Sequence, residues 1–136
     1  MLTLFRVRSL GLLVLRGCLL IAIALVLGSA LSPADGPGLI PWDKARHFIA
    51  FYILASLGAL AFPRVSLVYT AIGLALFGVL IEILQGLVGR DRSTLDVVAD
   101  VVGIAAALTP FATSWWRRRF QGQDELQPSF FRAARR

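Results

Sequence analysis

The stretch SLVYTAIGLALFGVLIEILQGLV, residues 66–88, decides the fold, and its only strongly polar side chains are Glu82 and Gln85. The hydrocarbon core of a bilayer is about 30 Å thick, so a helix rising about 1.5 Å per residue needs about 20 residues to cross it. The apolar residues do not alternate with polar ones, and in lipid every backbone group must be bonded within its own segment. We therefore expect residues 66–88 to form a membrane-spanning α-helix.

Three further apolar runs of similar length accompany this segment, at about residues 10–31, 44–62 and 94–116. Charged residues make up only 16% of the chain and mean hydropathy is +0.76, whereas soluble domains carry about 25% charged residues. This composition excludes an ordinary soluble domain. The sequence predicts an all-α membrane protein in which residues 1–116 form a four-transmembrane-helix bundle.

Basic residues are distributed unevenly about the four runs. If the N-terminus is cytoplasmic, ten of the 14 lysines and arginines lie on the cytoplasmic side and four lie outside, as the positive-inside rule requires. We therefore expect both termini in the cytoplasm and a multi-pass protein of the bacterial cytoplasmic membrane. Topology also accounts for the net charge of +6, so we expect no nucleic-acid partner.

The two ends of the chain allow further expectations. Residues 117–136 are basic and polar, and we expect a disordered cytoplasmic tail or one that lies on the anionic inner leaflet. The first run could instead be a cleaved signal peptide, because Gly28-Ser29-Ala30 loosely fits a cleavage site. The remaining three spans would keep the same orientation in that case.

Polar side chains gather at the outer ends of three spans. They are Asp43, Lys44 and His47 in the second span, Glu82 and Gln85 in the third, Arg90 in the next loop, and Asp96 and Asp100 in the fourth. At about 1.5 Å per residue, His47, Glu82 and Asp100 lie at a similar depth, roughly 8–10 Å below the helix ends. Carboxylates at such a depth need partners. We expect the second, third and fourth spans to enclose an outward-facing polar pocket.

These residues resemble the VanZ-like family of small bacterial membrane proteins. The resemblance covers about residues 40–107 and is carried by Asp43-Lys44-x-x-His47-Phe48, Glu82-x-x-Gln85, Gly89-Arg90 and Asp96-x-x-x-Asp100-x-x-Gly103. The family usually has Asn where this chain has Asp100, which adds a negative charge here. The resemblance implies a role in the cell envelope, of the kind associated with tolerance of teicoplanin and similar glycopeptides.

Two functional hypotheses follow for the pocket. In the first, it binds or modulates an anionic or lipid-linked envelope molecule, with Lys44, Arg46 and Arg90 meeting phosphate or carboxylate groups. Membrane lipids are then the expected partners, and the chain could form a homo-oligomer.

The second hypothesis is an intramembrane enzyme that acts on a lipid-linked envelope substrate. His47 would be its acid or base, with Glu82, Asp96 and Asp100 as the other catalytic candidates. Metal-assisted hydrolysis by the same four residues is conceivable, but one histidine with carboxylates is a weak metal signature, better suited to Mg²⁺ or Ca²⁺ than to Zn²⁺. From the sequence we therefore assign no metal ligand and no cofactor. A small transporter is a third hypothesis, although four spans are few and no pair of broken helices is visible.

Overall fold

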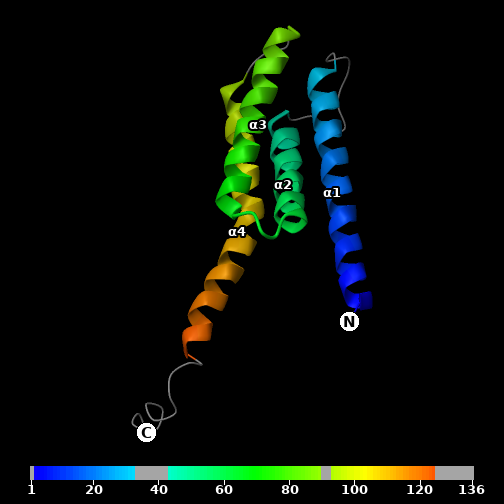
Figure 1. Cartoon of the computed structure of the whole chain (residues 1–136). Helices are drawn as coiled ribbons and strands as arrows, with labels where there is room; N and C mark the ends of the chain where they lie inside the picture. Colours follow the sequence, from blue (N-terminus) through cyan, green and yellow to red (C-terminus); the bar gives the residue numbers. More distant parts are fainter. Residues whose placement is uncertain (1, 33–42, 90–92, 125–136) are drawn as a thin grey trace.

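The computed structural model describes residues 2–32, 43–89 and 93–124, which form four α-helices and no strand. The helices are α1 (Leu2–Leu31), α2 (Asp43–Ala61), α3 (Leu67–Leu87) and α4 (Thr94–Asp124). Figure 1 shows that they run alternately up and down, so α1 begins and α4 ends at the same end of the bundle. We call this the termini end. The opposite end, where α2 and α4 begin, is called the distal end.

Three helices of the described part are long and apolar enough to cross a membrane, over Ser9–Leu31, Leu67–Leu87 and Thr94–Ser114. The first turns of α2 hold Lys44, Arg46 and His47, which shorten its apolar stretch. The outer surface is apolar, and large side chains such as Leu13 and Leu76 are 68% and 65% exposed. An apolar exterior of this extent is typical of a surface that faces lipid rather than water.

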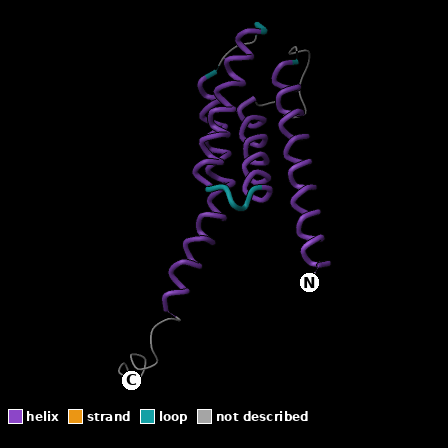
Figure 2. The backbone as a smooth tube through the Cα atoms, in the orientation of Figure 1, coloured by secondary structure: helices purple, strands orange, loops and turns teal. Residues whose placement is uncertain are grey.

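The bounds of α2 and α3 agree with the spans predicted from the sequence to within one residue. α3 begins after Ser66, whose side-chain oxygen accepts a hydrogen bond from the backbone N–H of Val68 at 3.3 Å, as an N-cap should. It ends at Leu87 with Val88 as the C-cap, and Gly89 follows with φ of +77°, a left-handed conformation that suits glycine. Figure 2 shows the short loop that joins α2 to α3 at the termini end.

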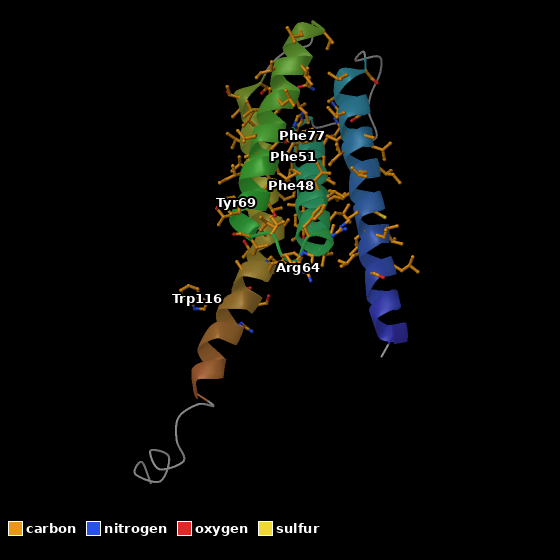
Figure 3. The ribbon with its side chains drawn as sticks, in the orientation of Figure 1. Phe48, Phe51, Arg64, Tyr69, Phe77 and Trp116 are labelled. Carbon is orange, nitrogen blue, oxygen red and sulfur yellow. The ribbon has the colours of Figure 1, made fainter. Side chains whose placement is uncertain are left out.

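The first and last helices, α1 and α4, are longer than expected. Our prediction that residues 117–136 are disordered is wrong for residues 117–124, which continue α4. Once a helix exists, each added residue costs little, and arginine and glutamine are good helix formers. Trp116, which is 61% exposed, lies on the part of α4 that extends past the ends of α2 and α3 (Figure 3). The rest of the expected tail lies outside the described residues.

α2 is the centre of the bundle and contributes most of its fully buried side chains. Phe51, Leu54, Ala55 and Ala61 have no exposed surface. The ring of Phe51 packs against that of Phe77 in α3, with centroids 6.0 Å apart. The backbones of α2 and α4 lie closer together still. A Cβ placed on Gly103 of α4 would collide with the backbone carbonyl of Phe48 in α2. Glycine at 103 therefore lets the two backbones touch.

α1 is attached to the other helices at its middle and at its distal end. At its middle, Arg16 Nε donates a hydrogen bond to the carbonyl of Ala61 in the last turn of α2 at 3.4 Å, and its guanidinium lies 5.0 Å from the centre of the Phe62 ring. Near the distal end, the side-chain amide of Gln85 donates to the carbonyl of Ala30 at 3.3 Å. These polar contacts fix the position of α1 along α2 and α3.

Replacing Gly103 with alanine tests the close approach of α2 and α4. The added methyl group must push the helices apart, so Gly103→Ala should destabilise the protein by about 1–3 kcal/mol and lower its thermal unfolding midpoint in detergent. Gly73→Ala is the control, because a Cβ there meets nothing within 4 Å. Equal midpoints for the two variants would contradict the packing described above.

Candidate functional site

The centre of the candidate site is a hydrogen bond between α2 and α4. His47 Nδ1 lies 2.9 Å from Asp100 Oδ1, and Asp100 is fully buried. An ionised carboxylate can only accept, so the imidazole N–H donates. The other oxygen, Oδ2, lies against Gly78 of α3, where a Cβ would have no room. Gly78 therefore provides the space into which Asp100 fits.

Asp96 presents a second carboxylate to the same imidazole. It lies one turn before Asp100 on the same face of α4, and only 3% of its surface is exposed. Its Oδ2 is 4.0 Å from His47 Nε2. The two nitrogens of the ring thus face two carboxylates from successive turns of one helix.

Glu82 joins the site from α3. The side chain is 8% exposed, and its Oε2 accepts a hydrogen bond from the backbone N–H of Ser93 at 3.0 Å, immediately before α4. The N-terminus of a helix favours negative charge because its first N–H groups point outward. Glu82 therefore links the end of α3 to the start of α4.

Two helices, α3 and α4, thus place carboxylates around the histidine of α2. One donor atom from each of His47, Glu82 and Asp96 can be chosen so that all three lie within 4.8 Å of one another. Two like unit charges at about 4–5 Å repel by roughly 3–4 kcal/mol at an effective dielectric constant of about 20. A cluster of this kind requires a shared proton, a neighbouring cation or a bound metal ion.

A pocket adjoins this cluster, but it lies elsewhere than we expected. We predicted a pocket enclosed by the second, third and fourth spans, whereas its lining comes from α1, α2 and α3: Val26, Ser29, Ala30, Arg46, His47, Ala50, Phe51, Ile81 and Gln85. Its cavity volume is about 90 Å³, and it is open to the surroundings on one side. Asp100 of α4 packs directly against α2 and α3, while the pocket opens beside small side chains of α1 and α2.

The predicted site residues divide into three groups. His47, Glu82, Asp96 and Asp100 come together, and Gln85 lies one turn from Glu82 at the pocket wall. Lys44 is exposed and does not line the pocket. The side chain of Asp43 and the whole of Arg90 lie outside what the structure describes.

Arg46 lines the pocket beside His47, where the binding hypothesis expected it to act together with Lys44 and Arg90. One contributor to the site was not predicted. The backbone N–H of Ser93 binds Glu82, and a backbone donor has no signature in residue type. The position of Ser93 just before an expected helix was the one available sign.

Comparison with protein-family models, curated proteins and solved structures finds no match to this chain. The resemblance to the VanZ-like family therefore stays a prediction from the sequence.

A double-mutant cycle measures the link between His47 and Asp100. The destabilisations of His47→Ala and Asp100→Ala should fail to add in the double variant, by roughly 0.5–3 kcal/mol, because each removes the same hydrogen bond. Thr109 gives a control pair, since its hydroxyl bonds within α4 to the carbonyl of Ala105 at 2.7 Å. His47→Ala and Thr109→Ala should add to within about 0.5 kcal/mol. Additivity in both cycles would mean that the ring and carboxylate do not interact.

Proposed function

We propose that this chain is a four-span protein of the bacterial cytoplasmic membrane that binds the anionic head group of a lipid or lipid-linked envelope molecule. The observation that carries the proposal is the pocket at the distal end, in which Arg46, His47 and Gln85 interrupt an otherwise largely apolar lining. Apolar walls suit hydrocarbon, and a guanidinium suits phosphate or carboxylate.

Charge supports an orientation with both termini in the cytoplasm. Arg16 binds the last turn of α2, Arg64 lies in the loop between α2 and α3 (Figure 3), and Arg117 lies on the extension of α4. All three belong to the termini end. The excess of basic residues at that end favours a cytoplasmic location, which puts the pocket near the outer leaflet.

The composition of α2 agrees with a fourth crossing. Its polar groups are confined to the first turns, and from Phe48 to Ala61 it is apolar except for Tyr52 and Ser56. The hydroxyl of Ser56 donates to the carbonyl of Tyr52 at 2.8 Å, so it needs no water. Because α2 packs between α1 and α4, His47 and its partners are shielded from hydrocarbon.

The pocket has the features needed for an anionic head group. Arg46 is exposed at the mouth, where a lipid phosphate could meet its guanidinium, and Gln85 and His47 offer polar atoms deeper in. Val26, Ile81 and Phe51 supply apolar contact for an attached chain. A role in the envelope, of the type that the VanZ-like resemblance implies for glycopeptide tolerance, is consistent with this chemistry.

An enzyme is the second candidate, and the hydrogen bond between His47 and Asp100 favours it. A carboxylate that holds one ring nitrogen orients the other for proton transfer. His47 could then take a proton from water as that water attacks a lipid-linked phosphate. The bond from phosphorus to the leaving oxygen would break, and the leaving oxygen would receive the proton from the imidazolium. Binding and catalysis differ in whether the head group is retained or consumed.

Cysteine labelling tests the orientation. Cys18 is the single cysteine, so a Cys18→Ser background can carry either Ser32→Cys, after α1, or Val65→Cys, between α2 and α3. A maleimide that cannot cross membranes should label Ser32→Cys on intact cells and Val65→Cys only after the inner face is exposed. The reverse pattern would refute the proposed topology.

Native mass spectrometry of the protein in detergent, with EDTA present, tests head-group binding. Arg46→Ala should weaken retention of an anionic lipid about tenfold or more, because it removes a charge-assisted contact of about 1.5–3 kcal/mol. Arg64→Ala, the same change at the termini end, should have little effect. Equal retention by both variants would exclude the pocket as the site, and consumption of a lipid-linked phosphate would favour the enzyme.

A further inference from the structure

We propose that His47, Glu82 and Asp96 bind a divalent cation at the distal end of the bundle, with Asp100 positioning the imidazole. Their donor atoms come from three helices and lie within 4.8 Å of one another. This site goes beyond head-group binding and does not depend on it.

The imidazole is oriented as a metal ligand should be. Its Nδ1 lies 2.9 Å from Asp100 Oδ1; with Asp100 ionised, Nδ1 carries the proton of the neutral ring and donates it, and the lone pair is on Nε2. Metal-binding histidines usually donate their other nitrogen to a carboxylate in this way. The Nε2 atom lies 4.0 Å from Asp96 Oδ2, too far for a hydrogen bond. Two atoms that each lie about 2.1 Å from one ion are separated by about 3–4.2 Å, so the spacing suits shared coordination.

A buried oxygen atom provides a second, independent observation. Within the described part of the chain, Glu82 Oε1 has no hydrogen-bond partner, and the side chain is more than nine-tenths buried. Glu82 already uses its other oxygen to accept from Ser93, so Oε1 is the atom left for an ion. Buried carboxylate oxygens without partners are rare in stable proteins.

The donor set indicates the class of ion. Carboxylate oxygens suit Mg²⁺, Ca²⁺ and Mn²⁺, while an imidazole nitrogen suits first-row transition ions. Mn²⁺ satisfies both preferences and is the probe of choice. A shared proton is the competing explanation for the same oxygens, and it predicts no specific metal binding.

Titration with Mn²⁺ alone, followed by electron paramagnetic resonance, tests the site on protein stripped with EDTA and free of added lipid. The wild-type chain should bind one Mn²⁺ at this cluster. Because His47 is the only histidine, imidazole ligation should appear as nitrogen modulation in the pulsed spectrum and should vanish in His47→Gln. Absence of specific binding, or bound Mn²⁺ without nitrogen modulation, would overturn the proposal.

Variants distinguish ligation from general electrostatic attraction. Glu82→Gln should bind Mn²⁺ at least tenfold more weakly than the wild type. Asp100→Leu should lower the affinity for Mn²⁺ about 10–100-fold, as expected when a residue that orients a metal ligand is removed. Asp100→Asn removes the same charge but keeps an oxygen that can accept from His47, so it should retain more affinity than Asp100→Leu. Equal binding by Glu82→Gln and wild type would contradict the site.

Protein stability provides a readout that does not need bound lipid. Mn²⁺ should raise the thermal midpoint of the wild type and not that of Glu82→Gln, which should fold without metal because it removes a repelling charge. Failure of the lipid experiment in EDTA would leave these results unaffected, so the two proposals can fail separately.

Discussion

A carboxylate between apolar helices must have a partner, and the pairing of Asp100 with His47 is the constraint on which the distal end of this bundle depends. The bond joins α2 to α4 at 2.9 Å, and breaking such a buried pair leaves an isolated polar group that is costly in a low dielectric. Two glycines make the pairing possible. Gly103 lets the backbones of α2 and α4 touch, and Gly78 opens the space that Asp100 occupies.

The same geometry determines what surrounds the pair. Asp96 lies near the pair because it precedes Asp100 by one helical turn on the same face of α4. Glu82 reaches the cluster because its side chain binds the backbone N–H just before α4. The polar groups are thereby turned inward, while the outer faces of α1 and α3 expose leucine and isoleucine to the surroundings. α1 is held against this end of the bundle by the hydrogen bond that Gln85 of α3 donates to the carbonyl of Ala30. A cluster of titratable side chains and a pocket thus lie side by side at one end of a small bundle, as the proposed recognition of an anionic head group requires.

Much of this arrangement could be predicted from residue order. Helix positions followed because the length of an apolar run is matched to bilayer thickness, and Ser66 marked the start of α3. The convergence of His47, Glu82, Asp96 and Asp100 followed from their equal depth and helical spacing. The pocket was predicted between the wrong helices because its walls depend on how each helix is rotated about its axis, and small residues such as Ser29 and Ala50 carry no strong signal. The extension of α4 was missed because a polar, basic segment can be helical or disordered with similar composition.

The most direct measurement of the central pairing is a solid-state nuclear magnetic resonance distance in lipid bilayers. The chain has one histidine, so ¹⁵N-labelled imidazole gives a single Nδ1 site, and ¹³C-labelled aspartate supplies the carboxyl carbon. A dipolar coupling that corresponds to direct hydrogen bonding, and that disappears in Asp100→Leu, is the result expected. A ring nitrogen with no nearby aspartate carboxyl carbon would contradict the convergence of α2 and α4 on which the site is built.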